Sequence, residues 1–289
     1  MPAFSEEESM VDHAKGRSIL ITGCSSGIGR CCALTLKARG YRVFATARRP
    51  EDVDSLKQEG FEAYVLDLRS SASIHQAVDK VLEATGGRLY GLFNNGAYGQ
   101  PGAVEDLRRE VLEEQFATNF FGTHELTARV IPVMRGQGEG RIIQNSSVLG
   151  FAAMRYRGAY NASKFALEGL TDTLRLELKG SGVEISLVEP GPITSRFREN
   201  AFAQYLKHID RDLSIHQTTY REMEARLLKD GPAVPFTLGP EAVVSKVIHA
   251  LESRRPKARY HVTFPTTLFA VLKRLLPDRA LDGLLGRVG

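Results

Sequence analysis

A glycine-rich turn near the start of the chain constrains the fold most. Ser18 to Ile21 form a short apolar run of strand length, which leads into a turn with three glycines, Gly23, Gly27 and Gly29. Residues 30–37 can then continue as a helix. Such a strand, turn and helix form a phosphate cradle, because glycines allow close backbone approach and the helix start presents free N–H groups. We therefore expect an α/β fold that holds an anionic ligand there, and a plain tight turn is the alternative.

Strand-length and helix-spaced segments then alternate along the chain. We expect strands at 18–21, 41–47, 61–66, 89–93, 141–147, 184–188 and 258–264. This alternation predicts a doubly wound parallel sheet (Rossmann-type) of about seven strands flanked by helices. With 289 residues and 43% hydrophobic residues, the chain can bury one sizeable core. We expect a flexible tail at 1–16 and a single catalytic domain at 17–289.

Composition narrows the class of protein and its location. The net charge of +4 is modest and mixed in sign, so it gives no basis for a nucleic-acid partner. The seven histidines lack the short spacings of metal ligands, and we expect no metal. The start of the chain is acidic, and no run of about 18 apolar residues occurs. These features indicate a soluble, cytoplasmic protein.

Three cysteines lie in the glycine-rich turn and the helix after it. Cys24, Cys31 and Cys32 are odd in number and include adjacent residues, so they cannot form an ordinary disulfide framework. This pattern fits a reducing compartment. For Cys24 we favour a packing role over thiol catalysis, because no histidine partner is evident.

The chemistry of the chain centres on Tyr160 and Lys164. Residues four apart lie on one face of a helix, so the phenol and the ammonium can share a site. A nearby cation favours phenolate and is expected to lower the tyrosine pKa from about 10 toward working pH. An ordinary surface pair is the alternative. The strand at 141–147 also delivers Ser146 and Ser147 to the crevice where such sheets bind ligands.

The chain resembles the short-chain dehydrogenase/reductases over about residues 17 to 263. The motifs that carry the resemblance are Thr22-Gly23-x-x-x-Gly27-Ile28-Gly29, Asn94-Asn95-Gly96, Asn119, Ser146-Ser147, Tyr160-x-x-x-Lys164 and Pro190-Gly191. Residues 165–169 and 189–193 look like the branch that holds hydroxysteroid and retinol dehydrogenases. Within it, Leu272-Lys273-Arg274-Leu275-Leu276-Pro277 looks closest to bacterial NADP-dependent aldehyde reductases.

The resemblance implies four catalytic residues. Tyr160 would exchange a proton with the substrate oxygen, and Ser147 would stabilise charge on that oxygen, with Ser146 in reserve. Lys164 would hold the cofactor ribose and tune the tyrosine. Asn119 would hold a water that links Lys164 to solvent, and simple satisfaction of backbone groups is its alternative role. No histidine is placed to activate a serine, so a serine hydrolase is the weaker interpretation.

We expect the cofactor to be NADP(H). Arg48 and Arg49 end the second strand, where a basic residue would pair with the 2′-phosphate and an acid would bind the 2′-hydroxyl of NAD. Solvation of a loop is the alternative for both arginines. Asp67 is expected near the adenine, with a helix N-cap or turn role as the alternative. The expected cofactor residues are Gly23, Ser25, Ser26, Gly27, Ile28, Gly29, Arg48, Arg49, Asp67, Leu68, Asn95, Gly96, Tyr160, Lys164, Pro190, Gly191, Ile193 and Thr194.

One loop departs from the family pattern. Relatives show Asn-Asn-Ala-Gly where this chain has Asn94-Asn95-Gly96-Ala97, so the glycine falls one place early. The loop is still expected beside the cofactor, without inference about its individual backbone contacts.

The remaining segments are expected to govern substrate choice and assembly. We predict a substrate lid at about 195–238, with a flexible surface excursion as its rival. The amphipathic segment at about 265–289 is expected to cover the pocket, and a subunit contact or peripheral membrane contact is the less favoured alternative. The apolar stripe of the helix at 158–179 predicts a homo-oligomer, a dimer or tetramer, or packing on the chain's own sheet.

These features predict an NADP(H)-dependent oxidoreductase that interconverts an apolar aldehyde or ketone and its alcohol, most simply a carbonyl (aldehyde) reductase. The nearer alternative is a steroid- or retinol-like alcohol dehydrogenase. The alternative of another class is a non-catalytic NADP-binding regulator, against which the retention of Tyr160 argues.

Overall fold

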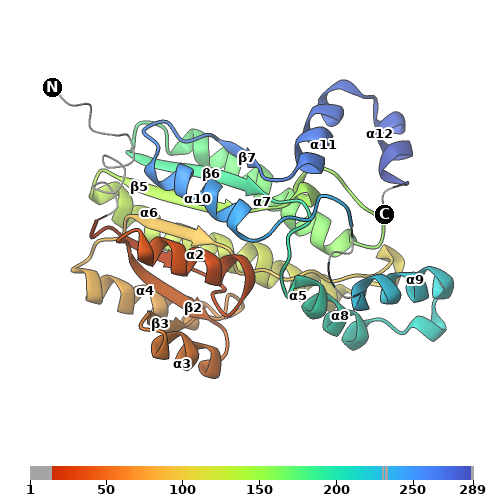
Figure 1. Ribbon diagram of the computed structural model, residues 1–289, viewed down its shortest axis with the longest axis horizontal. Helices are drawn as coiled ribbons and strands as arrows, with labels where there is room; N and C mark the ends of the chain where they lie inside the picture. Colours follow the sequence, from red (N-terminus) through yellow and green to blue (C-terminus); the bar gives the residue numbers. More distant parts are fainter. Residues whose placement is uncertain (1–14, 230, 232–233, 288–289) are drawn as a thin grey trace.

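A seven-stranded parallel sheet forms the centre of the molecule (Figure 1). The computed structural model describes residues 15–229, 231 and 234–287. The strand order is β3-β2-β1-β4-β5-β6-β7, and every neighbouring pair is parallel. The strands are β1 (Ser18–Ile21), β2 (Arg42–Ala47), β3 (Glu62–Val65), β4 (Gly91–Asn94), β5 (Gly140–Asn145), β6 (Val183–Glu189) and β7 (Arg259–His261). The predicted doubly wound sheet is confirmed.

Helices cover both faces of this sheet, and each face has its own apolar core. One core joins β1 and β2 to α2 (Gly27–Ala38), α3 (Pro50–Gln58) and α10 (Glu241–Glu252). The other joins the opposite face to α4 (Ser71–Thr85), α6 (Thr123–Gly136) and the end of α7 (Gly158–Glu177). The strands are buried on both sides, which explains why they read as apolar runs in the sequence.

The strand order reverses between β1 and β4, and this reversal places the site. Chain connections leave β1 toward one edge of the sheet and β4 toward the other, so the loops that follow them diverge at the carboxyl ends. A crevice opens at such a switch point, and open α/β sheets bind their ligands there. The loops after β1, β4 and β5 all reach this edge.

The helical stretch before β5 contains a local irregularity at Asn119. The sequence predicted a short and then a long helix between 104 and 135. The structure instead has a 3₁₀ turn η1 (Val104–Asp106), α5 (Arg109–Phe116), a π-helical segment η2 (Ala117–Gly122) and then α6. A π-helical segment shifts the hydrogen-bond register by one residue, and such segments are frequent at functional sites.

The segment predicted as a lid is folded into two regular helices that share a core with α5 and the start of α7. These are α8 (Phe197–His208) and α9 (Gln217–Leu228), joined by the short turn η4 (Arg211–Leu213). Tyr205 and Tyr220 are fully buried, and their rings lie tilted to each other at 5.5 Å between centroids. The described part of this segment is therefore not an unstructured excursion.

The C-terminal part forms two helices, α11 (Phe264–Leu275) and α12 (Asp278–Leu285). The predicted seventh strand is too long at its end, because α11 begins at Phe264 with Pro265 in its first turn. Phe269, Leu281 and Leu285 pack on Val148 and Ala152, beside the loop after β5. Figure 1 shows both helix pairs, α8 with α9 and α11 with α12, at the end of the molecule toward which β5 and β6 point. No helix within the described ranges has the length and apolarity to cross a membrane.

Candidate active site

Tyr160 and Lys164 lie on one face of α7, and both side chains are buried. The Lys164 ammonium lies 5.7 Å from the centroid of the Tyr160 ring. It donates a hydrogen bond of 2.7 Å to the backbone oxygen of Asn145, the last residue of β5. The two side chains therefore lie in the interior at the carboxyl end of the sheet, and the alternative of an ordinary surface pair is wrong.

The expected lowering of the Tyr160 pKa is wrong for the protein alone. Burial raises the pKa of Tyr160 to about 12, and a hydrogen bond from Ser147 only partly opposes this effect. Burial also lowers the pKa of Lys164 to about 8, although the charge of Glu168 counteracts it. The prediction that Tyr160 and Lys164 share one face of a helix is correct. Burial of the phenol nevertheless dominates its pKa, and the Lys164 ammonium is hydrogen-bonded to Asn145 O.

The two serines after β5 point in different directions, as alternation along a strand requires. Ser147 faces Tyr160, and its hydroxyl accepts a hydrogen bond of 3.1 Å from the Leu149 N–H. Ser146 lies on the other side, where a Cβ added to Gly150 would be 2.6 Å from its Oγ and 3.0 Å from Glu168 Oε1. The geometry brings Ser147 to the tyrosine and keeps Ser146 away from it.

Asn119 occupies the π-helical segment and is fully engaged through its side chain. Its Oδ1 accepts from the Tyr98 N–H at 3.2 Å, and its Nδ2 donates to Tyr98 O at 2.9 Å and to Ser163 Oγ at 3.2 Å. These bonds tie the loop after β4 to α7. The backbone-satisfying role weighed against the relay is thus present, and the water-mediated proton relay from Lys164 stays a prediction.

A cavity of about 400 Å³ lies along the carboxyl ends of β1 to β4. Eight of the predicted cofactor residues line it, and they come from four separate loops: Gly23, Ser25, Ser26, Arg48, Arg49, Asp67, Leu68 and Gly96. The structure therefore brings the residues expected around the adenosine half together in one place. The other predicted residues, including Gly27 to Gly29 at the start of α2, lie outside this lining.

The glycine turn has the close approaches that a dinucleotide requires. Gly23 has φ +72° and Gly27 has φ +55°, both in the left-handed region. A Cβ on Gly29 would lie 2.2 Å from Gly23 O, so only glycine lets α2 start this close to the turn. The Ser26 side chain does not cap α2, and the first turn of α2 contains no acidic residue. The free N–H groups at the start of α2 suit a phosphate, and the residues present fit a dinucleotide.

The end of β2 presents two arginines in different states. Arg49 makes a bidentate ion pair with Asp52, at 2.8 Å and 2.9 Å, and its side chain is half exposed. Within the part of the chain that the structure describes, Arg48 forms no ion pair, and it lines the cavity. Arg48 is therefore the arginine free to meet a phosphate. Asp52 was missed in the sequence, because it belongs to the first turn of α3 and not to the strand end.

Asp67 lines the same cavity and has a turn role. Its Oδ1 accepts from the Arg69 N–H at 3.0 Å, and the two side chains form an ion pair at 2.8 Å. The Arg69 guanidinium lowers the pKa of Asp67. The N-cap of the following helix is Ser70, which accepts from Ser73 N, so the N-cap alternative for Asp67 is wrong.

The exchanged loop after β4 is held by Thr22. Its Oγ1 accepts hydrogen bonds from the N–H groups of Asn95 at 2.9 Å and Gly96 at 2.8 Å. Asn95 Nδ2 in turn donates to Thr22 O at 2.9 Å. A Cβ on Gly23 would lie 2.9 Å from the Gly96 Cα. The loop thus packs against the glycine turn despite the displaced glycine.

The segment from Pro190 to Thr194, expected beside the nicotinamide, packs on two neighbouring parts of the chain. Val148 N donates to Pro190 O at 2.8 Å, next to Ser147, and Thr194 N donates to Leu238 O at 2.9 Å. A Cβ on Gly191 would lie 2.1 Å from Thr263 Oγ1, so glycine lets the start of α11 approach the loop. This segment is therefore held on both sides, by the loop after β5 and by the C-terminal part.

Helix α8 contributes residues that the sequence did not single out. Arg196, Asn200, Ala203, Gln204 and Lys207 line the cavity from the side opposite the glycine turn. Phe197 packs edge-to-face on Tyr160 at 5.4 Å between ring centroids and remains 37% exposed. Only its position in the predicted lid could have pointed to it, because an isolated phenylalanine in a polar segment carries no spacing signal.

Two further sequence expectations concern thiols and metals. Cys24 is buried, its Sγ donates to Ile21 O at 3.3 Å, and burial raises its pKa to about 12. A thiolate at neutral pH is therefore disfavoured, which agrees with the packing role. In residues 15–229, 231 and 234–287, no group of three or more His, Cys, Asp or Glu side chains converges in the manner of a metal site.

Comparison with known proteins decides the family. The family model described as short chain dehydrogenase matches residues 17–206, which include the glycine turn, Ser147, Tyr160 and Lys164. The chain belongs to the short-chain dehydrogenase/reductase family. The resemblance read from the motifs is thereby confirmed.

Individual members of the short-chain dehydrogenase/reductase family align along nearly the whole chain. An uncharacterized oxidoreductase, YbbO, of Escherichia coli (strain K12) is 46% identical and covers 93% of this chain and 94% of its own length. The 17-beta-hydroxysteroid dehydrogenase type 6 of Bos taurus is 32% identical over 97% of this chain and 91% of its own. An NADPH-dependent 3-dehydrocapnine reductase of Ornithobacterium rhinotracheale is 32% identical over 92% and 95%.

A solved member of the family shares the architecture. A short-chain dehydrogenase/reductase of Burkholderia phymatum in complex with NAD superposes with a TM-score of 0.76 at 26% identity, and covers 94% of this chain and 96% of its own. As a family member this chain is an oxidoreductase that acts on CH–OH or C=O groups and uses a nicotinamide cofactor. The choice between NAD and NADP, and the substrate, depend on residues particular to this chain.

Proposed function

We propose that this protein is an NADP(H)-dependent carbonyl reductase that acts on apolar aldehydes or ketones. The observation that carries the proposal is the placement of Tyr160, which is buried at the carboxyl end of the sheet beside Ser147 and one helical turn from Lys164. Its phenol is buried, hydrogen-bonded by Ser147, and has a pKa of about 12, so it holds its proton throughout the neutral range. A protonated phenol is a proton donor, which is what carbonyl reduction requires.

The side chains divide the work of reduction among them. The bound nicotinamide supplies a hydride to the carbonyl carbon. Tyr160 donates its proton to the carbonyl oxygen, and the Ser147 hydroxyl hydrogen-bonds that oxygen as it gains charge. Lys164 lies one helical turn away with its ammonium on Asn145 O, where it can hold a ribose hydroxyl and stabilise the phenolate that remains. Addition of the hydride to carbon and of the proton to oxygen converts the carbonyl compound into an alcohol.

The NADP preference rests on the basic end of the cavity. Arg48, Arg49, Arg69, Arg196 and Lys207 line it, against the acids Asp52, Asp67 and Glu114. Arg48 forms no ion pair within the described residues and can pair with a 2′-phosphate, whereas Asp52 already neutralises Arg49. A relative with NADPH dependence in its name supports the same choice.

The apolar substrate class rests on the surroundings of the Tyr160 ring. Phe197 of α8 packs on it, and a Cβ on Gly99 would lie 2.8 Å from the Phe197 ring. A substrate that reaches the Tyr160 hydroxyl must therefore lie against Phe197 and the loop after β4. This contact favours apolar carbonyl compounds.

A second candidate is the oxidation of a steroid-like alcohol, which the hydroxysteroid dehydrogenase relative favours. Oxidation needs Tyr160 as a base, and its raised pKa disfavours the phenolate. Initial rates with secondary alcohols and NADP⁺ or NAD⁺, compared with rates of the reverse reactions, distinguish the two candidates. Oxidation that is faster than reduction at neutral pH would replace the present proposal.

We also propose a homo-oligomer in the cytoplasm. The helices expected to build the interface carry exposed apolar side chains, Phe121 in η2 and Phe165 and Leu176 in α7. Leu167 of α7 and Leu178 directly after this helix are instead buried in the chain's own core. Sedimentation equilibrium should give a mass at least twice that of one chain. A monomer at micromolar concentration would contradict this part.

The test of the proposed function is a panel of apolar aldehydes and ketones with NADPH and NADH. We expect NADPH oxidation to exceed NADH oxidation and to rise with the apolar surface of the substrate. A clear NADH preference would overturn the assignment of Arg48. NADPH binding by fluorescence without turnover of any carbonyl or alcohol would favour the non-catalytic regulator.

A further inference from the structure

The face of α7 that carries the catalytic pair continues with two acids. Tyr160, Lys164, Glu168 and Asp172 follow each other every four residues, so their side chains stack along one side of the helix. Glu168 is the residue one turn beyond Lys164, and it is buried. The line leads from the reacting tyrosine, through the lysine, into the interior between α7 and the last strands of the sheet.

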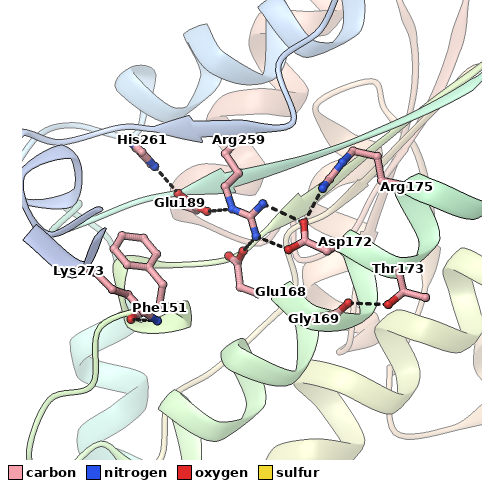
Figure 2. A network of polar contacts seen from close by, with 10 residues as sticks. All are labelled: Phe151, Glu168, Gly169, Asp172, Thr173, Arg175, Glu189, Arg259, His261 and Lys273. Atoms are coloured by element: carbon pink, nitrogen blue, oxygen red, sulfur yellow. Dashed lines mark hydrogen bonds and ion pairs between the residues drawn. The ribbon is translucent and has the colours of Figure 1, made fainter. Parts of the chain in front are cut away.

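Arg259 of β7 clamps this line of side chains to β6 (Figure 2). Its guanidinium contacts Glu168 at 2.9 Å, Asp172 at 2.8 Å and Glu189 at 3.1 Å. Figure 2 shows the Arg259 side chain between α7 and Glu189, the last residue of β6. Glu189 directly precedes the Pro190–Gly191 turn, so one guanidinium joins the Lys164 helix to the loop expected beside the nicotinamide.

Of the three carboxyl groups on Arg259, Glu168 and Glu189 do not share the negative charge equally. Burial and the neighbouring Glu168 charge raise the pKa of Glu189 to about 8, and its side chain is fully buried. Burial also raises the pKa of Glu168, but Arg259 and Ser146 favour its charged form. At neutral pH the proton therefore resides mainly on Glu189 and the negative charge on Glu168.

One carboxylate oxygen of Glu168 faces the turn after Ser147. Glu168 Oε1 and Ser146 Oγ are both buried there. Both line the space beside Gly150, in the turn after Ser147. Arg259 holds Oε2 at 2.9 Å, so the carboxylate is fixed in place between β7 and the turn after Ser147.

We propose that Glu168 is a positioning residue for Lys164: its carboxylate, anchored by Arg259 to β6 and β7, keeps the Lys164 side chain an ammonium that remains hydrogen-bonded to Asn145. This inference rests on the proposed function, in which the charged Lys164 holds the ribose and supports Tyr160. Glu189 serves as the proton-bearing partner that leaves the charge on Glu168.

The charged and titratable groups around Lys164 come from several elements. Tyr160 and Glu168 belong to its own helix, and Glu189 approaches from β6. Arg259 and His261 approach from β7, and His261 contacts Glu189 at 2.9 Å. Further away, Arg175 pairs with Asp172, and Lys273 of α11 lies 4.9 Å from the ring of Phe165, next to Lys164 in sequence. Glu168 is the charge that opposes burial in setting the Lys164 pKa.

The direction of the effect follows from the sign of that charge. Glu168→Gln removes the carboxylate that favours the ammonium, so Lys164 must lose its proton at a lower pH. Loss of an opposite charge one helical turn away is expected to lower the Lys164 pKa by about one unit from its value of about 8. In the enzyme with cofactor bound, the pKa of the alkaline limb of the kcat/KM profile must fall by the same amount. At a pH above both limbs, kcat/KM of the variant should be about tenfold lower than that of the wild type.

The experiment measures the Lys164 titration directly in the protein without cofactor. The ¹³Cε signals of labelled lysines are followed by NMR from pH 6 to 10, and Lys164 is assigned through Lys164→Arg. Glu168→Gln is compared with Glu189→Gln, a matched control that replaces a mainly protonated carboxyl and leaves the charge on Glu168. The first variant should shift the Lys164 pKa down by about one unit, and the second by less than about 0.3 unit.

The outcomes separate this inference from the proposed function. No shift in Glu168→Gln, or equal shifts in both variants, would overturn the positioning role even if NADPH turnover is normal. A shift confined to Glu168→Gln in a protein that reduces no carbonyl would support the role and contradict the proposed function. If Glu168→Gln does not fold, Glu168→Asp keeps the charge and must keep the Lys164 pKa, and a downward shift of one unit would contradict the inference.

Discussion

The two walls of the cavity are built in different ways. The wall formed by the loops after β1 and β4 relies on main chain and glycine: Gly23 packs against Gly96, and Thr22 holds the N–H groups of Asn95 and Gly96. The second wall is formed by α8 and the residue before it, which present long side chains such as Arg196 and Lys207. Tyr205 and Tyr220 of the α8–α9 pair belong to a core that also includes residues of α5 and α7.

This difference separates what the family shares from what is particular to this chain. Main-chain contacts serve any dinucleotide, because a phosphate is recognised by N–H groups and space. The cavity-facing side chains of α8 belong to neither core of the sheet, so they can change without disturbing it. We therefore expect substitutions in the first wall to affect every substrate alike, and substitutions in α8 to discriminate between substrates.

The sharpest test of the first wall is Gly29→Ala. Its Cβ would lie 2.2 Å from Gly23 O, so the turn and the start of α2 must move apart. We expect NADPH affinity, measured by fluorescence titration, to fall about 100-fold, as strain of about 3 kcal/mol would produce. Gly169→Ala in α7 is the control, because nothing lies within 4 Å of its Cβ. Wild-type affinity in Gly29→Ala would contradict the main-chain account.

A smaller effect is expected at the end of β2. Arg48→Ser should raise the KM for NADPH about tenfold and leave the KM for NADH unchanged, because only one cofactor carries the 2′-phosphate. Arg49→Ser should change either constant less, because Arg49 is engaged by Asp52 at 2.8 Å. Both constants are obtained from initial rates with one carbonyl substrate. An equal effect of the two substitutions would show that the ion pair opens when the cofactor binds.

The smallest predicted effect concerns the second wall. Phe197→Ala removes the ring that packs on Tyr160 at 5.4 Å between centroids. We expect the KM for a long apolar aldehyde to rise about three- to tenfold and the KM for a short one to change little, since only the former fills the lost contact. Leu206→Ala, on the same helix and 62% exposed, is the matched control. An equal rise in KM for both aldehydes would indicate that Phe197 supports the position of Tyr160 and does not select the substrate.

The sequence predicted the first wall well because its determinants are local. The glycine spacing from Gly23 to Gly29 and the apolar runs of the buried strands are visible in short windows, and the parallel sheet follows from their alternation. The helix spacing likewise placed Tyr160 and Lys164 on one face. Alternation along β5 explains why Ser147 and not Ser146 reaches the tyrosine.

The sequence did not predict features that depend on distant contacts. The rise of the Tyr160 pKa follows from burial by several elements, which a pair of residues four apart does not reveal. Arg259 lies 91 positions from Glu168, so their contact could not be foreseen. The regular helices α8 and α9 were read as irregular, because their buried faces are short and rich in tyrosine and polar residues.

The central claim, that Tyr160 gives a proton to a carbonyl oxygen during reduction by NADPH, is tested most directly by removing one hydroxyl. Tyr160→Phe is compared with Tyr98→Phe, whose phenol lines the same cavity and also has its pKa raised by burial to about 12. We expect kcat for an apolar aldehyde to fall about 1,000-fold in Tyr160→Phe, with NADPH affinity retained, and to change less than threefold in Tyr98→Phe. Comparable rates in wild type and Tyr160→Phe would contradict the account.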